Sequence, residues 1–532
     1  MGTSIQKKIY LDAFPQIPGA GGTISPEAKK QIEQTIKDGA LLINYTGHGS
    51  ERQWAQERIL DEIQIQTIKN KRLPLLVTAT CEFGRQDDPV FPSGGELFML
   101  QPGGGAIGLV TTARPVSSST NFELNQAFYD ALFQKENGGN LTLGEIFRRT
   151  KNNSLSGVSN RNFSLIGDPS MHLAMPTHTV KITSITTASG SDTLKALSTV
   201  EVSGEIVTSD DERMEGFTGT LEATLFDKET SFQTLGNENS PFHYKQWFNA
   251  LFRGSASVED GSFTFRFIMP KNIAYAVDEG KLSVYAYDGN TALEAAGYST
   301  AFMVGSSEPD VPEDKAPPEI KLYLNDPTFS DGDVTHSRPT LMGRFSDESG
   351  INISGYGIGN SIIAVLDDNE TFVLNEYYMA EQDDYTKGNL VFTMPQLQPG
   401  PHSITLRAWD THNNPGVAKI NFKVSGTNDL LIESFAGYPN PTREKAQFYF
   451  THNQAGNDLE TRLLIYDRNG KVLLDYAIPI AESTQRVNLV EVSVSENSGK
   501  KLPPGLYLAR LIVRSLADGS KNERVTKLII AN

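Results

Sequence analysis

The chain has little cysteine and no long hydrophobic run. Its 532 residues include a single cysteine, Cys81, so an internal disulfide is excluded and stability must come from packing. No apolar stretch reaches the roughly 20 residues that a helix needs to cross a bilayer. The first residues, MGTSIQKKIYLDAF, also lack the charged start and apolar stretch of a secretory signal. We therefore expect either a cytoplasmic protein or a piece of a longer precursor, and the later domains favour the precursor.

The chain also has fewer basic than acidic residues. Lysine and arginine total 47 against 64 aspartates and glutamates, which leaves a net charge of −17. Such an acidic surface argues against nucleic acid or an anionic membrane as the partner. The length exceeds what one hydrophobic core organises, so several domains are expected.

Residues 1–177 alternate the patterns of strands and helices. Apolar runs predict buried strands at 41–46, 73–81 and 106–112, and helices are predicted at 25–39, 59–72, 121–133 and 142–151. Ser25 is the expected N-cap of the first helix, with Pro26 at its first position and Gly39 as its stop. Thr142 and Glu145 stand at capping-box spacing. Alternation of this kind predicts an α/β domain with parallel strands joined by right-handed crossovers.

The character of the sequence changes after residue 177. Short alternating runs predict a β-sandwich at 178–305, and a proline-rich, acidic linker follows at 306–319. Two further β-sandwiches are predicted, an Ig-like domain at 320–427 and a last domain at 428–532. In the last domain the letters RNG, ending at Gly470, predict a hairpin turn. The predicted fold class is therefore a multidomain chain with one α/β domain and three β-sandwiches.

His48 and Cys81 each follow a predicted buried strand and lie 33 residues apart, enough for one crossover helix. In an open parallel sheet, side chains just beyond the carboxyl ends of neighbouring strands meet at one edge. There an imidazole can activate a thiol nucleophile and later protonate a leaving amine. Gly47 and Gly49 leave room for a substrate backbone, and the amides of Gly49 and Cys81 are candidate oxyanion donors. Two other readings stay open: a buried small hydrophobe for the cysteine and a simple turn for the histidine.

Other candidate sites are weaker. One cysteine and scattered histidines offer no zinc-ligand spacing, so neither a metal nor a cofactor is expected. The acidic stretch containing Asp326, Asp331 and Asp333 departs from the EF-hand pattern and is expected to be a solvated turn. The glycines of QPGGGAIG precede a strand instead of opening a helix, which excludes a phosphate loop.

The residues around His48 and Cys81 resemble the gingipain family of cysteine peptidases. The resemblance is carried by four stretches in the expected order: NYTGHGSERQW, TATCEFGRQDDP, SGGELFMLQPGGGAIGLVTTARPVSSSTNFELN and NFSLIGDPSMHLAMP. It covers roughly the first third of the chain and implies a partial caspase-like α/β fold. By the same resemblance Cys81 is the nucleophile and His48 the general base and acid, and Gly49 and Cys81 form the oxyanion hole. Trp54 is then either a lining of the substrate cleft or a packing residue.

The long β-tail resembles the processing branch of this family more than its digestive proteases. Residues 438–450 carry a Pro-x-Pro start at Pro439 and Pro441, and LLIYDRNGKVL, LPPGLYLARLIV and KLIIAN resemble later motifs of a type IX secretion sorting domain. The resemblance implies a C-terminal signal peptidase, or sortase, at the surface of a Bacteroidetes bacterium. Its substrates would be cargo proteins with sorting domains, its acceptor a lipopolysaccharide amine and its docking partner an outer-membrane β-barrel shuttle protein.

One departure and two alternatives accompany this resemblance. Family members often orient the imidazole with an upstream acid, and that position would fall before residue 1, because the nearest acid, Asp12, does not match the motif. The sequence therefore resembles the C-terminal part of a larger precursor. The alternatives are a broad secreted protease that is itself type IX cargo, and a non-catalytic surface adhesin on a decayed protease scaffold.

Overall fold

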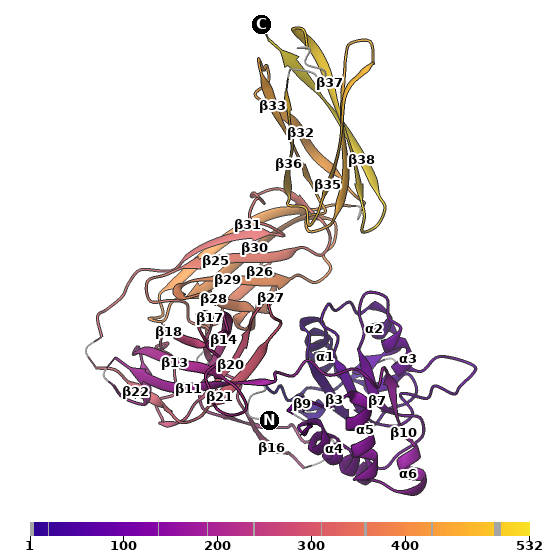
Figure 1. Ribbon diagram of the computed structural model, residues 1–532, viewed down its shortest axis with the longest axis vertical. Helices are drawn as coiled ribbons and strands as arrows, with labels where there is room; N and C mark the ends of the chain where they lie inside the picture. The colour runs from indigo at the N-terminus through magenta and orange to yellow at the C-terminus, as the bar shows by residue number, and fades with distance from the viewer. Residues whose placement is uncertain are drawn as a thin grey trace.

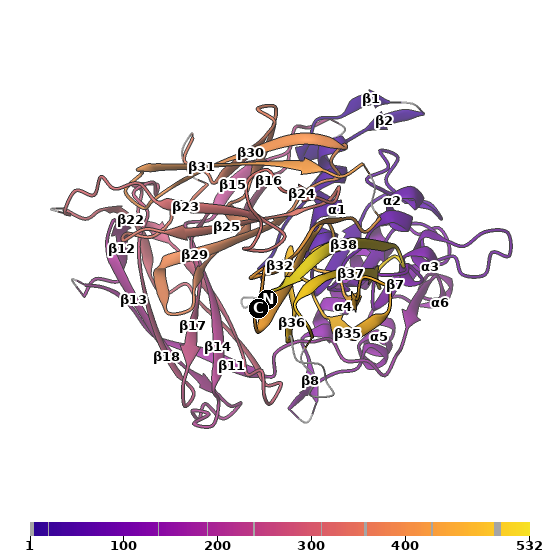
Figure 2. The same ribbon diagram turned by 90° about the horizontal axis from the view of Figure 1, so that it is seen from above.

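The computed structural model describes residues 5–531 except 20, 137, 189, 238–239, 310, 356–358, 427–428 and 494–501. An α/β domain occupies one side of the molecule, and β-units extend from it along the long axis to the C-terminus (Figure 1). Seen from above, the α/β domain again stands to one side of the first two β-units (Figure 2). The catalytic candidates and the β-tail are thus in separate parts of the molecule.

The α/β domain is built around a four-stranded sheet. The sheet strands are β3 (Leu42–Thr46), β6 (Leu75–Ala79), β7 (Gly108–Thr112) and β10 (Phe163–Gly167). The helices are α1 (Pro26–Asp38), α2 (Glu62–Thr67), α3 (Gly94–Met99), α4 (Ser118–Leu132), α5 (Leu143–Asn152) and α6 (Gly157–Arg161), with the short helix η1 (Leu11–Ala13). Three small hairpins complete the domain: β1 (Ile17–Gly19) with β2 (Gly22–Ile24), β4 (Gln53–Trp54) with β5 (Leu60–Asp61), and β8 (Lys135–Glu136) with β9 (Gly139–Asn140).

The strand order is β10-β7-β6-β3, with β3, β6 and β7 parallel and β10 antiparallel to β7. The predicted parallel pairing with crossovers is thus confirmed for the three strands. The expectation that residues 41–46 form a fully buried strand is wrong. Strand β3 lies at the edge of the described sheet, and Asn44 and Thr46 are exposed, because an edge strand has a neighbour on one side only.

Apolar residues on successive positions of β6 serve two different cores. Leu76 packs with Ile32 and Ile36 of α1 in one cluster, whereas Leu75 and Val77 pack in the other. The second cluster also contains residues of α4 and α5, among them Leu124 and Ile146. Side chains alternate between the faces of a strand, so the sheet is covered on both sides and its carboxyl-end rim carries the loops.

The predicted helices form with changes at their ends. Pro26 opens α1 and Gly39 ends it at φ 90°, as predicted, but the Ser25 hydroxyl donates to the Pro15 carbonyl instead of capping the helix. The helix predicted at 59–72 is confined to Glu62–Thr67. Asn70 explains the early end, because its buried amide group bonds the backbone of Arg72 and Gly105 and so holds this segment in a turn.

The capping box predicted for α5 is only half formed. The Thr142 hydroxyl accepts the Glu145 amide at 3.2 Å. The Glu145 carboxylate does not bond the Thr142 amide and instead accepts hydrogen bonds from Arg148 and Arg149. These bonds lower the pKa of Glu145 to about 2. Two guanidinium groups one turn along the helix outcompete a single backbone amide, since bonds between charged groups are the stronger ones.

The first β-unit follows residue 177. Its strands are β11 (His178–Thr187), β12 (Thr193–Ala196), β13 (Thr199–Val207), β14 (Gly219–Phe226), β15 (Thr230–Gln233), β16 (His243–Gln246), β17 (Ala250–Val258), β18 (Ser262–Ile268), β19 (Asp278–Glu279), β20 (Lys281–Tyr287), β21 (Glu294–Ser299) and β22 (Met303–Ser307). Its core gathers the inward residues of these strands, including Val202, Leu221 and Val284.

The second β-unit begins at residue 319 and is joined to the first. Its elements are β23 (Glu319–Leu324), β24 (Val334–Thr335), β25 (Thr340–Ser346), β26 (Ile363–Leu366), β27 (Glu370–Val373), η2 (Asn375–Tyr377), β28 (Tyr378–Glu381), β29 (Asp384–Thr393), β30 (Gly400–Trp409) and β31 (Pro415–Val424). The sequence predicted two separate sandwiches, yet one sheet of each unit continues into the other through the parallel pair Gly254↔Ala380. Open backbone groups on the edge strand β17 explain this joint.

The last β-unit stands at the far end of the long axis (Figure 1). It contains β32 (Ile432–Tyr438), β33 (Lys445–His452), β34 (Leu459–Tyr466), β35 (Val472–Ile480), β36 (Arg486–Ser493), β37 (Gly505–Ser515) and β38 (Lys521–Ile530). They form two sheets, β32-β33-β36 and β35-β34-β37-β38, around one core. The predicted hairpin is confirmed, because β34 and β35 pair antiparallel and Gly470 has φ 81° in their turn.

Candidate active site

His48 and Cys81 lie just beyond the carboxyl ends of two adjacent parallel strands. In the register of β3 and β6, Thr46 is the partner of Ala79. The pairing continues past the named strands, because the Gly47 amide donates to the Ala79 carbonyl at 3.4 Å. His48 then follows Gly47 by one residue and Cys81 follows Ala79 by two, so both emerge at one rim of the sheet, as the sequence predicted.

Gly49 and Thr80 bring the two loops into direct contact. A Cβ placed on Gly49 would lie 2.4 Å from the Thr80 hydroxyl oxygen and 3.2 Å from its methyl group. Only a hydrogen at this position therefore lets the histidine loop rest against the residue that precedes Cys81. From the sequence, Gly49 is expected to leave room for a substrate backbone. In the structure it has a second role, because it lets the two loop backbones approach each other closely.

The backbone of His48 is fixed by two hydrogen bonds. Its carbonyl accepts the Tyr45 hydroxyl at 2.6 Å and the Ala55 amide at 2.8 Å. Burial raises the pKa of Tyr45 well above its ordinary value, so this phenol stays protonated and keeps donating. The imidazole itself is exposed at the rim, where a substrate can reach it.

Cys81 is half-buried, and its thiol faces the start of α4. The sulfur lies 3.6 Å from the carbonyl oxygen of Val116, two residues before the helix begins. The Asn121 side-chain amide of α4 donates to the Ala79 carbonyl at 2.9 Å, which ties the helix to the end of β6. The thiol is thus neither deep in the core nor loose in solvent.

The two proposed oxyanion amides have no backbone acceptor. Gly49 faces Trp54 across an isolated antiparallel bridge, whose hydrogen bonds run from Ala55 to His48 and from Ser50 to Gln53. The Gly49 amide therefore lies outside that ladder. In the parts of the chain that the structure describes, neither this amide nor that of Cys81 donates to another group. Both are available for the oxygen of a tetrahedral intermediate.

An arginine not singled out from the sequence links the two loops. Arg85, four residues after Cys81, pairs with Glu51 of the histidine loop at 3.1 Å and with Glu82 at 3.5 Å. The Glu51 carbonyl also accepts the Gly94 amide at the start of α3. Nothing in the sequence indicates this pairing, because the partners are 34 residues apart and each resembles an ordinary surface charge.

Neither Trp54 nor Asp12 takes part in the candidate site. Trp54 is 1% exposed and stacks on Tyr45, with ring centroids 4.4 Å apart and planes within 5°. It is a core residue and not part of an open cleft, because its indole fills the space beneath the His48 loop. Asp12 does not orient the imidazole, since its carboxylate accepts the amides of Gly236 and Asn237 in the first β-unit.

The acidic stretch of the second β-unit is not a simple solvated turn. Asp326 is buried and accepts Thr328 and, across the junction with the last β-unit, the Gln485 amide. Asp331 and Asp333 accept other partners, Asn421 and Ser330. The prediction failed for Asp326 because the sequence does not show that the last β-unit packs over this turn.

The rim carries the groups that acyl transfer requires. A half-buried thiol, an exposed imidazole and two free amides emerge from adjacent strand ends. In such a set the thiol can attack a carbonyl, the imidazole can protonate a leaving group and the amides can stabilise a developing oxyanion.

None of the helices in the described residues is long and apolar enough to span a bilayer.

The chain is similar to a known family and to several solved structures. Residues 3–174 match the model of peptidase family C25. Among solved structures the chain is similar to dimeric latent PorU from Porphyromonas gingivalis, with 32% identity over 75% of this chain and 39% of that chain and a TM-score of 0.33. It is also similar to the complex of Porphyromonas gingivalis RgpB pro- and mature domains, with 18% identity over 52% of this chain and 57% of that chain and a TM-score of 0.26.

The chain therefore spans 39% of the length of the PorU chain that it matches. A comparison with curated proteins found no match. The His48 and Cys81 motifs both fall inside the matched residues 3–174, and the structure brings them to one rim. The α/β domain of this chain is therefore similar to peptidase family C25, the gingipain family of cysteine peptidases.

Proposed function

We propose that Cys81 and His48 form the catalytic pair of an acyl-transfer peptidase. The Cys81 thiolate attacks the carbonyl carbon of a peptide bond, and the oxyanion is bound by the amides of Gly49 and Cys81. His48, which has taken the thiol proton, gives it to the departing amine. Water or a second amine then attacks the thioester and regenerates the thiol.

The observation that supports this proposal most strongly is the contact of the two loops. Gly49 rests against Thr80, and each flanks one member of the proposed pair, which supports an arrangement in which the imidazole can reach the thiol. The amides of Gly49 and Cys81, which donate to no other group within the described residues, would supply the oxyanion donors.

We further propose that the peptide substrates are type IX secretion cargo proteins with C-terminal sorting domains. The support is the 32% identity with PorU and the sorting-domain motifs of residues 428–532. The new carboxyl end would be joined to a lipopolysaccharide amine at the outer cell surface. Residues 428–532 would dock an outer-membrane β-barrel shuttle protein by strand addition, and failure of the full chain to co-purify with such a barrel would remove this last element.

Product mass tests the function. The full chain is incubated with a cargo protein that ends in a sorting domain, with and without an amine acceptor, and the new carboxyl terminus is identified by mass spectrometry. A free acid without acceptor and an amide with acceptor are expected, because water and amine compete for one thioester. Free acid in both reactions would leave a peptidase and exclude the sortase. An intact cargo in both would contradict the whole proposal.

Substitution of Gly49 tests the contact between the loops. We expect Gly49→Ala to lower kcat/KM by roughly 10- to 100-fold, because its Cβ would meet the Thr80 side chain and push the imidazole away from the thiol. Adding Thr80→Ala removes the two side-chain atoms that clash, though not the Gln53 carbonyl oxygen 3.0 Å away, and should restore part of the loss. Thr80→Ala alone is the matched control, since the Thr80 hydroxyl has no hydrogen-bond partner to lose. Equal activity of Gly49→Ala and wild type would show that the contact does not position the pair.

A further inference from the structure

Three aspartates from separate segments meet at the junction of the first two β-units. Asp314 lies in the segment that connects β22 to β23, Asp347 directly follows β25, and Asp410 directly follows β30. One carboxylate oxygen from each lies within 4.8 Å of the other two. The residues are 33 and 63 positions apart in the chain, so only the fold brings them together.

The cluster is buried, and among the described residues a histidine is the one basic group within ion-pair distance of it. Asp410 is 0% and Asp347 7% exposed, and the Asp314 side chain is 9% exposed. In the described residues no lysine or arginine pairs with any of them, and the nearest basic atom is His412 Nδ1, 3.8 Å from Asp314 Oδ2. Three carboxylates in this setting repel one another and are poorly solvated, which is unfavourable unless a proton or a cation neutralises part of their charge.

A second observation points to a missing ligand. Asp314 Oδ1 accepts the Ala316 amide at 2.9 Å, but Asp314 Oδ2 is buried without any hydrogen-bond partner, and its one printed neighbour is His412 Nδ1 at 3.8 Å. Both ring nitrogens of His412 beside it are also buried without a partner. Buried polar atoms are nearly always satisfied by protein, water or an ion, so this orphaned oxygen requires a partner.

The other oxygens of the cluster are held in place. Asp347 Oδ1 accepts the Ser349 amide and hydroxyl, and both Asp410 oxygens accept bonds from Asn414. The Asn414 side chain also donates to the Asp314 carbonyl at 3.1 Å. The carboxylates are therefore oriented by the loops and are not free to turn away from one another.

We propose that Asp314, Asp347 and Asp410 bind one calcium ion. The ligands are hard oxygens from irregular loops, which suit calcium better than a transition metal, and calcium tolerates less regular geometry than magnesium does. The carboxylates would supply the charge, with backbone oxygens and water completing the shell. This inference is independent of the peptidase activity, because the cluster lies in the β-units.

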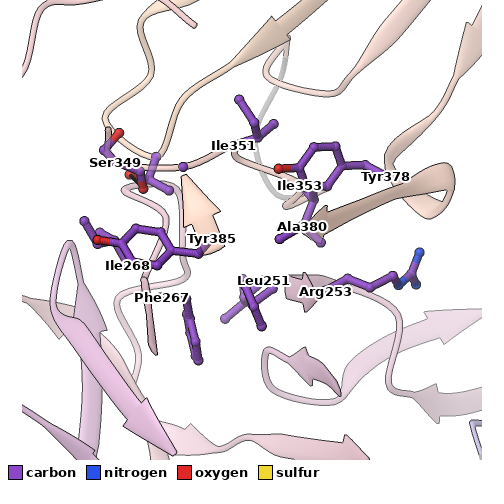
Figure 3. A pocket seen from close by; sticks show the side chains of 13 residues that line it. Leu251, Arg253, Phe267, Ile268, Ser349, Ile351, Ile353, Tyr378, Ala380 and Tyr385 are labelled. Carbon is purple, nitrogen blue, oxygen red and sulfur yellow. Dashed lines mark hydrogen bonds between the residues drawn. The ribbon is translucent and has the colours of Figure 1, made fainter. Parts of the chain in front are cut away.

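The ion would rigidify the joint between the two β-units. Ser349 and Thr411, next to Asp347 and Asp410, line a pocket together with Leu251 and Phe267 of the first β-unit (Figure 3). The Thr411 carbonyl accepts the Lys271 amide at 2.8 Å across the same junction. A cation that fixes both loops and the connecting segment would therefore also fix the relative orientation of the units.

Calorimetric titration of the full chain with calcium chloride alone, after removal of divalent ions, tests the site. We expect one binding event, weakened at least about tenfold by Asp410→Asn, since loss of a charged ligand lowers calcium affinity. Asp331→Asn is the matched control, because within the described residues its carboxylate bonds only Asn421, and its binding should equal wild type. Circular dichroism checks folding, and if Asp410→Asn is unfolded, Asp314→Asn in the connecting segment takes its place.

Three results would overturn the proposal. The first is no calcium binding by the wild type up to millimolar concentration. The second is unchanged affinity in the folded Asp410→Asn or Asp314→Asn chain, which would place the ion elsewhere. The third is equally tight binding of magnesium, which would contradict the assignment to calcium. None of these results would affect cleavage of cargo by the wild type. The calcium proposal and the proposed function can therefore be contradicted independently of each other.

Discussion

Replacing Cys81 with alanine is expected to lower turnover of a cleavable peptide by about 10⁴-fold or more. Removal of a nucleophile leaves only binding and oxyanion stabilisation, which is why such losses are among the largest seen in enzymes. The fold should be nearly unaffected, because the thiol is half-buried and makes one weak contact, to the Val116 carbonyl at 3.6 Å. We expect the free energy of unfolding to change by about 1 kcal/mol or less.

A matched variant separates the loss of the nucleophile from damage to the rim. Thr80→Ala alters the neighbouring residue, whose hydroxyl has no hydrogen-bond partner, and should keep most of the activity. Turnover is measured with the same peptide for both variants, and circular dichroism confirms that each is folded. Turnover by Cys81→Ala within a factor of about ten of wild type would mean that another group attacks the substrate, contrary to the roles assigned to the rim.

Acid is expected to destabilise the last β-unit through His452. This side chain is fully buried, with Nε2 donating to the Thr484 carbonyl and Nδ1 accepting the Gln454 amide. Burial lowers its pKa to about 4 from an ordinary 6.5, outweighing the hydrogen bond to Thr484 and the charge of Asp326. The unfolded chain takes up the proton more readily than the folded chain does. The contribution of His452 to the free energy of unfolding is therefore fully present above pH 6.5. As the pH falls toward 4, about 3 kcal/mol of this free energy is lost.

Urea unfolding at several pH values between 7.5 and 4 measures this loss. Hydrogen–deuterium exchange of peptides from β33 and β34 follows the last β-unit separately from the rest. The variant His452→Gln should show a flatter dependence on pH, since an amide does not titrate in this range. His243→Gln, at an exposed histidine of β16, is the control and should behave as wild type. Identical pH dependence in His452→Gln and wild type would assign the acid sensitivity to other groups.

The sequence by itself determined the local elements and the chemistry-bearing residues. The proline and glycine at the ends of α1 act within a few residues, so they predict its bounds without knowledge of the fold. Apolar runs likewise predicted the strands that carry His48 and Cys81. Since parallel strands end at one edge, the position of these two residues just beyond adjacent strand ends also followed from the order of the elements.

Tertiary structure decided what depends on contacts between distant segments. The burial of Trp54 under Tyr45, the pairing of Arg85 with Glu51 and the junction between Asp326 and Gln485 each join residues whose neighbours in the chain give no sign of the contact. The same holds for the edge position of β3 and for the three aspartates that we assign to calcium. Burial and charge pairing are properties of the packed chain, so a side chain that resembles an ordinary surface or cleft residue in the sequence acquires its role only when another segment folds against it.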